Sequence, residues 1–198
     1  MSHDEETVSV YDEQAGKYLE VITKASDDPT LADFLKRLPA GGRVLDLGCG
    51  PGHYASAMCD AGYNVTATDA SSVMVELTGK NKGLNVYQST FEDLDKTQIY
   101  DGIWANFSLL HASQTDFPKH LKQIASALKP SGVFHIGMKV GTDGHRDSLG
   151  RYYSYYSIHD LTEHLNRAGL IVDNETTGEG TGLSGSIEPW VVLQAVKS

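Results

Sequence analysis

The fold is decided by the stretch Val44-Leu45-Asp46-Leu47-Gly48-Cys49-Gly50-Pro51-Gly52-His53-Tyr54. It predicts a short buried strand over 43–47, a loop with three alternate glycines, and a helix over 53–61. Glycine in such a loop permits positive φ and lets a ligand come close to the backbone. The start of the following helix offers free N–H groups to an anionic group. A tight turn without any ligand would also use glycines, so the loop needs support from the rest of the chain.

Strands and helices alternate outward from this unit. Residues 1–39 have a helical, acidic pattern in which Val10, Leu19 and Ile22 lie among charges, and a helix is expected over 29–38. Asp28 suits its cap and Pro29 its first turn. Farther along, strands are expected over 63–68, 84–87, 102–107 and 133–138, and helices over 71–78, 116–128 and 157–167, with a turn at 130–132. Such alternation indicates a parallel sheet covered on both faces.

The C-terminal end departs from this pattern. A strand is expected to begin at 170–172 and a final strand to cover 190–196. Between them there is no helical pattern, only an expected loop that holds Gly178, Gly180, Gly182 and Gly185. Two strands joined without a helix must be antiparallel neighbours. The predicted fold is therefore α/β: a doubly wound, mostly parallel seven-stranded sheet of Rossmann-like type with an antiparallel C-terminal hairpin.

Composition narrows the function classes. A length of 198 residues suits one domain, divided here into an N-terminal helical cap over 1–40 and a core over 43–198. The net charge of −10 argues against tight nucleic-acid binding. From the acidic residues 1–11 and the lack of a long apolar run we expect neither a signal peptide nor a membrane-spanning helix. Cys49 and Cys59 are then expected to be reduced thiols of a cytoplasmic protein. The histidines lack metal-ligand spacing, and the oligomeric state is left open.

Two carboxylates indicate what kind of ligand the glycine loop binds. Asp69 follows the second predicted strand, 21 residues after Gly48, about the distance at which an acid reaches the ribose hydroxyls of a bound nucleoside. Asp46 stands two residues before the first glycine, where its charge would repel a pyrophosphate but suit an ammonium and a sulfonium. These spacings predict a nucleoside that carries a cationic amino-acid tail.

At these residues the chain resembles the class I S-adenosylmethionine-dependent methyltransferases of small-molecule type. The run Asp46–Gly52 is similar to the family's first motif, and the resemblance extends at least from Tyr11 to Met138. It implies S-adenosylmethionine as the cofactor, with Asp46 near the amino group and Asp69 on the ribose. The cofactor-binding residues that it implies are Tyr11, Tyr18, Asp46, Gly48, Cys49, Gly50, Gly52, Asp69, Ala70, Ser71, Met74, Thr90, Phe91, Glu92, Asn106, Phe107 and Ser108. One departure is Thr90, which stands where many members have an acid near the adenine.

The acceptor side is less sharply defined. Methyl transfer from a sulfonium needs a base only when the nucleophile must lose a proton, and His111, just past the fourth predicted strand, is the candidate base. A packed or hydrogen-bonded histidine is the plainer alternative. The substrate-binding candidates are Lys139, Arg151, Tyr152, Tyr153 and Trp190. The two cations favour a small, anionic acceptor, although the tyrosines could equally belong to a surface strand and a helix cap.

Two other functions stay open at the level of sequence. An NAD-dependent oxidoreductase shares a glycine loop and a ribose-binding acid, but the spacing Gly48-x-Gly50-x-Gly52 is not G-x-G-x-x-G. A cofactor-binding subunit without turnover would carry the same motifs as an enzyme. The acceptor and its reacting atom are not identified by the sequence, because fold and cofactor do not fix a substrate.

Overall fold

A computed structural model describes residues 4–21, 25–81 and 83–198 of the chain. Ile22, which belongs to the predicted helical pattern at the N-terminus, lies outside the described residues. The helices, including short 3-10 turns written η, are α1 (Glu5–Glu13), α2 (Ala15–Val21), η1 (Ala25–Asp27), α3 (Pro29–Lys36), α4 (His53–Asp60), α5 (Ser72–Thr78), η2 (Phe91–Asp93), η3 (Leu109–His111), α6 (Phe117–Ala127) and α7 (Ile158–Arg167). The strands are β1 (Arg43–Leu47), β2 (Asn64–Asp69), β3 (Asn85–Gln88), β4 (Tyr100–Asn106), β5 (Leu128–Lys139), β6 (Gly144–Arg146), β7 (Tyr152–Ser154), β8 (Leu170–Thr181) and β9 (Ile187–Lys197).

The predicted sheet is confirmed. In the described part of the chain, seven strands pair in the order β3-β2-β1-β4-β5-β9-β8. The strands from β3 to β5 run parallel, whereas β9 is antiparallel to both β5 and β8. The chain leaves β1 toward β2 on one side and returns to β4 on the other. In open α/β sheets, this switch point is where ligands bind, beyond the carboxyl ends of the strands.

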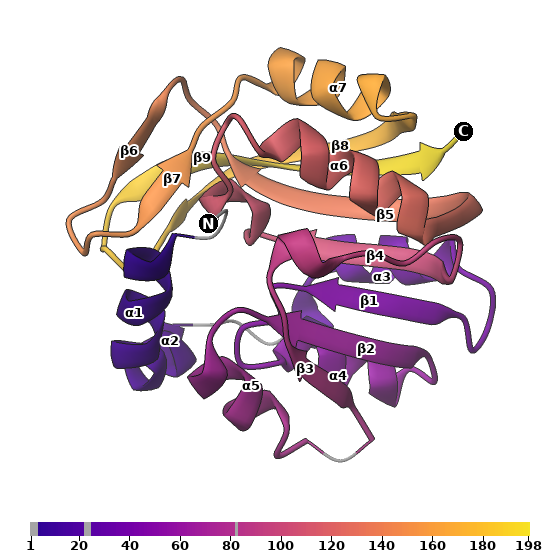
Figure 1. Ribbon diagram of the computed structural model, residues 1–198, viewed down its shortest axis with the longest axis horizontal. Helices are drawn as coiled ribbons and strands as arrows, with labels where there is room; N and C mark the ends of the chain where they lie inside the picture. The colour runs from indigo at the N-terminus through magenta and orange to yellow at the C-terminus, as the bar shows by residue number, and fades with distance from the viewer. Residues whose placement is uncertain (1–3, 22–24, 82) are drawn as a thin grey trace.

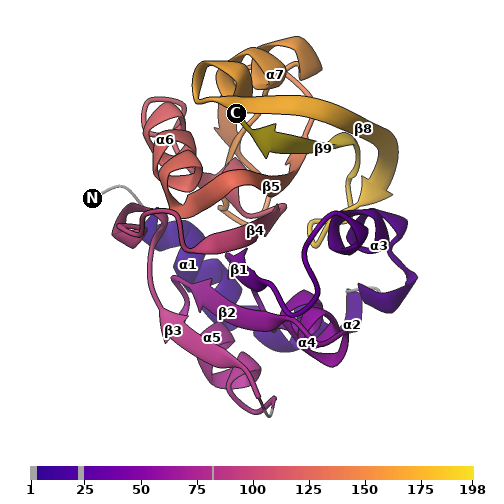
Figure 2. The same ribbon diagram turned by 90° about the vertical axis from the view of Figure 1, so that its right-hand side faces the viewer.

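Helices cover the sheet on both faces, and their caps follow from local sequence (Figures 1 and 2). One face packs against α6 and α7, and the opposite face packs against α3 and α4. The carboxylate of Asp28 accepts the Thr30 N–H at 2.8 Å and so begins α3, with Pro29 in its first turn. The Ser71 hydroxyl likewise accepts the Met74 N–H at 2.9 Å and begins α5.

Helices α1 and α2 do not cover a face of the sheet. They lie at the edge where the parallel strands end, opposite the carboxyl ends of β1 and β4 (Figure 1). This arrangement places the N-terminal helices over the switch point, where the glycine loop also lies. Within the described ranges, no helix is long and apolar enough to cross a membrane.

The C-terminal half differs from the sequence prediction in three places. The expected loop between 172 and 190 is mostly strand, because β8 continues to Thr181 and β9 begins at Ile187. Residues 144–146, expected to be loop, pair with residues 152–154, for which a surface strand was one of the open alternatives, and form the separate β6–β7 hairpin. The expected turn at 130–132 lies inside β5, where Ser131 has a φ of 61° and the pairing with β4 shifts register. Glycine-rich and polar strands lack the apolar alternation by which strands are recognised.

Candidate functional site

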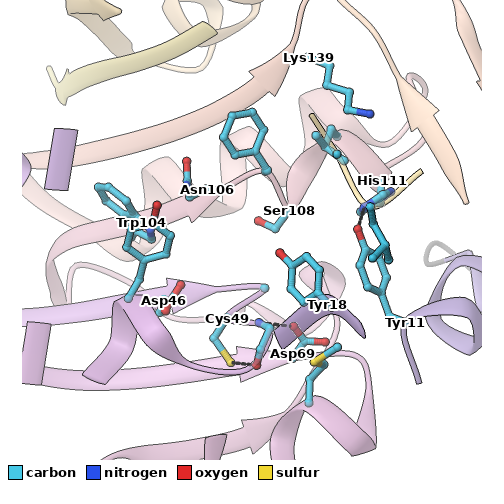
Figure 3. A pocket seen from close by; sticks show the side chains of 18 of the residues that line it. Tyr11, Tyr18, Asp46, Cys49, Asp69, Trp104, Asn106, Ser108, His111 and Lys139 are labelled. Atoms are coloured by element: carbon cyan, nitrogen blue, oxygen red, sulfur yellow. Dashed lines mark hydrogen bonds between the residues drawn. The ribbon is translucent and has the colours of Figure 1, made fainter. Parts of the chain in front are cut away.

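A cavity of about 860 Å³ lies where the carboxyl ends of the strands meet the N-terminal helices (Figure 3). Its walls come from the glycine loop, the loop after β4, helices α1 and α2, the β6–β7 hairpin and the β8–β9 hairpin. Ligand pockets in proteins commonly measure roughly 300–1,000 Å³, so this one has room for a large ligand or for two smaller ones.

The glycine loop forms the floor of the cavity and has the predicted backbone. Gly48, Gly50 and Gly52 have φ values of 77°, 51° and 80°, in the left-handed region that favours glycine. The N–H groups of Gly48 and Cys49 both donate to the Thr68 carbonyl, at 2.8 and 2.9 Å. The loop is therefore tied to the end of β2 and held open toward the cavity.

Asp69, the last residue of β2, fixes the far side of this loop. Its Oδ2 accepts the Gly50 N–H at 2.8 Å, and its Oδ1 accepts the Ser71 N–H at 2.9 Å. Burial raises the pKa of this carboxyl, whereas the two backbone hydrogen bonds lower it. Each carboxylate oxygen keeps a second acceptor site. Asp69 can therefore accept from two vicinal hydroxyls of a ligand while it holds the loop.

Asp46 is a buried acid that lacks a complete set of partners. Its Oδ2 is inaccessible to solvent and has no hydrogen-bond partner among the described residues. Burial and the nearby charge of Asp69 raise the pKa of Asp46 from 3.8 to about 8, although a backbone hydrogen bond from Ala55 lowers it. A buried unpaired carboxylate is costly, and a cationic group close by would offset that cost. The cavity wall at Asp46 is therefore suited to a positive ligand group.

This shift predicts how the stability of the empty protein depends on pH. Between about pH 4 and 8 the folded protein holds a proton on Asp46 that the unfolded chain has released, so the free energy of unfolding falls as pH rises through that window. We expect Asp46→Asn to lose less stability than the wild type between pH 5 and 8 in urea unfolding experiments. Asp33→Asn, at an exposed site, is the matched control. Parallel pH curves for the wild type and Asp46→Asn would contradict the assignment.

The N-terminal helices are fastened to the core by side chains at several points. The Thr7 hydroxyl accepts the Tyr152 N–H at 2.8 Å, and Asp12 accepts from the Ser71 hydroxyl. Arg146 donates to Asp4 at 2.7 and 2.9 Å. Tyr18 points into the centre of the cavity (Figure 3). Helices α1 and α2 thus stand in a closed position above the glycine loop.

His111 lies at the inner end of this closure, and its hydrogen bonds define its tautomer. Nδ1 lies 2.6 Å from the Tyr152 carbonyl, which can only accept, so Nδ1 carries the proton. The bare Nε2 then accepts from the Tyr11 hydroxyl at 2.9 Å, and Arg151 donates to the same hydroxyl oxygen at 3.0 Å. Burial lowers the pKa of His111 to about 4. The imidazole is therefore neutral at pH 7, and Tyr11 stands at its basic nitrogen.

The two cations of the predicted substrate pocket are already paired within the protein. Arg151 donates to Asp147 through Nε at 3.0 Å and through a terminal nitrogen at 2.6 Å. Lys139 pairs with Glu188, and its Nζ lies 3.9 Å from the centre of the Tyr153 ring. Because each cation has its own carboxylate, the charge argument for an anionic acceptor loses its basis.

Most of the predicted site residues line this one cavity. Those that do so are Tyr11, Tyr18, Asp46, Gly48, Cys49, Gly50, Asp69, Ala70, Met74, Thr90, Phe91, Asn106, Phe107, Ser108, His111, Lys139, Arg151, Tyr153 and Trp190. Four others do not. Gly52 packs against Thr78, so closely that a Cβ on Gly52 would lie 2.4 Å from Cγ2 of Thr78. The Ser71 side chain caps α5, and the Glu92 side chain pairs with Lys119. Tyr152 contributes backbone groups to Thr7 and His111, and its hydroxyl lies next to Gly144.

The cavity also contains residues that the sequence reasoning missed. His53 and Tyr54 follow the glycine loop directly, so their position offered a usable signal. Trp104 is paired in register with Asp46 on the neighbouring strand, a relation that requires the sheet order. Residues 180–183 reach the cavity because the β8–β9 hairpin extends beyond the rest of the sheet.

Comparisons with known proteins agree with this geometry. The family model described as "Methyltransferase domain" matches residues 27–175. An uncharacterized methyltransferase of Staphylococcus carnosus is 28% identical over 127 residues, covering 64% of this chain and 61% of that protein. The cypemycin N-terminal methyltransferase of a Streptomyces species is 30% identical over 133 residues, covering 63% of this chain and 54% of that protein. The chain thus spans little more than half the length of these relatives.

Two solved structures have the same fold. One is the 1,6-didemethyltoxoflavin-N1-methyltransferase of Burkholderia thailandensis with bound 1,6-didemethyltoxoflavin and S-adenosylhomocysteine. It has a TM-score of 0.73 and 20% identity, and the match covers all of this chain and 92% of that one. The other is a Haloferax volcanii complex between the Trm112 methyltransferase activator and a methyltransferase. It has a TM-score of 0.75 and 18% identity, with coverage of 96% and 97%.

Proposed function

This chain belongs to the methyltransferase domain family, and from that membership we propose that it transfers a methyl group from S-adenosylmethionine to a small-molecule acceptor. The observation that carries the proposal is the pair of carboxylates at the glycine loop. Asp69 holds the loop open with two spare acceptor sites, and Asp46 presents a buried, unpartnered oxygen. A nucleoside with a cationic amino-acid tail satisfies both.

The residues present fit such a cofactor. Asp69 would accept from the ribose hydroxyls, and Asp46 would lie near the ammonium group. Ala70, Met74 and Phe91 offer apolar surface on the side of Asp69, where the adenine would lie. Thr90 is already engaged with Asp93, through its N–H and its hydroxyl at 2.8 Å each. Thr90 therefore contributes loop structure in place of an acidic acceptor. An NAD cofactor is disfavoured, because its pyrophosphate would lie beside the carboxyl group of Asp46.

When bound, the cofactor supplies an activated methyl group on a sulfonium. The protein has to align the acceptor with that group and exclude water. Water is kept out by helices α1 and α2 in their closed position, with Tyr11 and Tyr18 facing the cavity. For an acceptor that must lose a proton, we propose a route through the Tyr11 hydroxyl to Nε2 of His111, since Tyr11 occupies the only basic nitrogen of that ring. The low pKa of His111 favours acceptors that need little help from a base.

The acceptor is expected to enter beside Lys139, Arg151, Tyr153 and Trp190. The size of the cavity and the acidity of the chain support a small molecule over a nucleic acid. We further propose a single domain with a cytoplasmic location, which the free thiols of Cys49 and Cys59 support. The activator in the Haloferax volcanii complex belongs to that protein, and the oligomeric state of this chain stays open.

The proposal is tested by S-adenosylhomocysteine release. Purified protein and S-adenosylmethionine are incubated with a panel of phenols, amines, thiols, carboxylic acids and metalloid oxyanions, and the product is quantified by mass spectrometry. At least one acceptor is expected to raise product formation above the no-acceptor rate. Product formation that Asp69→Ala leaves unchanged would show that the turnover comes from another source.

Closure by the N-terminal helices gives a further prediction. The cap is expected to become more protected when S-adenosylhomocysteine binds, because the ligand fills the space beneath Tyr11 and Tyr18. Hydrogen exchange of peptides covering residues 8–21 should slow in the presence of ligand. Peptides from α7, which does not line the cavity, should exchange at the same rate with and without it. If residues 8–21 exchanged at the same rate with and without ligand, these helices would have only a structural role.

A further inference from the structure

Beside the two carboxylates, the cavity is lined by aromatic side chains, among them Phe107, which the resemblance assigned to the cofactor. Phe107, in the loop after β4, and Trp190, in β9, are half-buried side chains that line the cavity. Their ring centres are 6.3 Å apart and their planes meet at 88°. Aromatic surface left partly uncovered inside a cavity favours an occupant that covers it.

Trp190 has a fixed orientation because it rests on glycines. It is paired with Gly178 across the β8–β9 hairpin and with Lys139 on the other side. A Cβ on Gly178 would lie 2.4 Å from Cζ2 of the indole, and a Cβ on Gly180 would lie 3.3 Å from Nε1. Any side chain at 178 would therefore occupy the space of the indole. The two glycines let the ring lie flat against β8, so that its other face is free to form a wall of the cavity.

Phe107 is held in a comparable way. It has a φ of 54°, in the left-handed region that a residue with a side chain rarely adopts. Its N–H donates to the Gly137 carbonyl at 3.0 Å. A Cβ on Gly137 would lie 3.3 Å from Cδ2 of the Phe107 ring. The strained backbone and the neighbouring glycine together fix the direction of this second aromatic wall.

We infer that Phe107 and Trp190, whose planes meet at 88°, form an L-shaped slot for the methyl acceptor, in which a flat ring stacks on the indole. The slot selects flat aromatic or heteroaromatic rings over saturated ones. Gly178 is the specificity-determining position, since it sets the plane of the indole. The charges at the rim are balanced by the Lys139–Glu188 pair, so the slot suits a ring without net charge. This inference rests on the proposed function and deepens it by naming the class of acceptor.

The test uses a flat and a saturated probe with the same skeleton, 2-naphthol and decahydro-2-naphthol. The full chain is first titrated with S-adenosylhomocysteine by calorimetry and then, saturated with it, titrated with each probe. We expect 2-naphthol to bind at least about fivefold more tightly. The two probes share a carbon skeleton and one hydroxyl group and are of comparable hydrophobicity, so an apolar pocket without a preference for flat rings would bind them about equally.

Variants assign the preference to the slot. Gly178→Ala is expected to abolish the preference for 2-naphthol, whereas Gly180→Ala, with more room, should keep most of it. Trp190→Phe should retain part of the preference and Trp190→Leu none, all with unchanged affinity for S-adenosylhomocysteine. Trp190→Leu decides the question if Gly178→Ala fails to fold. Equal binding of both probes to the wild type, or a preference that survives Trp190→Leu, would overturn the slot. Failure to bind S-adenosylhomocysteine would instead overturn the proposed function, and the slot with it.

Discussion

Gly48→Ala is expected to weaken S-adenosylhomocysteine binding more than about a hundredfold and to destabilise the fold. A Cβ at this position would lie 2.4 Å from Cβ of Ser108, and the φ of 77° already disfavours alanine. The Ser108 hydroxyl donates to the Leu47 carbonyl at 2.6 Å, so the loop after β4 cannot move aside without breaking that bond. Backbone strain of about 1–2 kcal/mol adds to the overlap, and the floor of the cavity shifts.

A control variant, Gly62→Ala, separates the effect of backbone strain from that of steric overlap. Gly62 has a φ of 91°, but a Cβ there would meet nothing within 4 Å. Gly62→Ala should therefore show the strain alone, with a modest loss of stability in urea unfolding and unchanged ligand affinity by calorimetry. If Gly48→Ala and Gly62→Ala behaved alike, the close approach of the glycine loop to Ser108 would not matter for binding.

Asp69→Ala is expected to weaken S-adenosylhomocysteine binding roughly ten- to hundredfold, about 1.5–3 kcal/mol for the loss of a charged acceptor. The structure adds a second cause, because the carboxylate also holds the N–H groups of Gly50 and Ser71. The affinity should be measured by calorimetry, beside Asp33→Ala as a control at an exposed acid. Circular dichroism and thermal unfolding show whether the variant keeps its fold. An unchanged dissociation constant in a folded Asp69→Ala protein would remove Asp69 from the ribose site.

The part of the fold that was predictable from sequence is the part with strong local signals. The strand at Arg43–Leu47 and the helix that begins at Pro29 were expected with those starts, because apolar alternation and a capping pair act over a few residues. The C-terminal β8–β9 hairpin was predicted, but its full length and the β6–β7 hairpin were not. Their glycines and polar residues gain strand structure from pairing partners and from Trp190, which are non-local effects.

The candidate site likewise contains residues that local sequence predicts and residues that only tertiary contacts bring together. The residues of the glycine loop and Asp69 lie close together in sequence, so spacing and resemblance were enough to predict them. The pairing of Arg151 with Asp147 and Tyr11 was not predictable, since Tyr11 comes from a helix 140 residues earlier. The same holds for Trp190 and Gly178, which meet only through the register of β8 and β9. Spacing and resemblance therefore led to residues that line one cavity on the proposed cofactor side, whereas the acceptor side depends on tertiary contacts.

The cavity beside the glycine loop is expected to bind S-adenosylmethionine and its product in preference to a dinucleotide. Calorimetric titration of the wild-type chain with S-adenosylhomocysteine and, separately, with NAD compares the two cofactors that a glycine loop of this kind could hold. We expect saturable binding of one S-adenosylhomocysteine per chain and no detectable heat with NAD. Binding of NAD in place of S-adenosylhomocysteine, or binding of neither, would contradict the account.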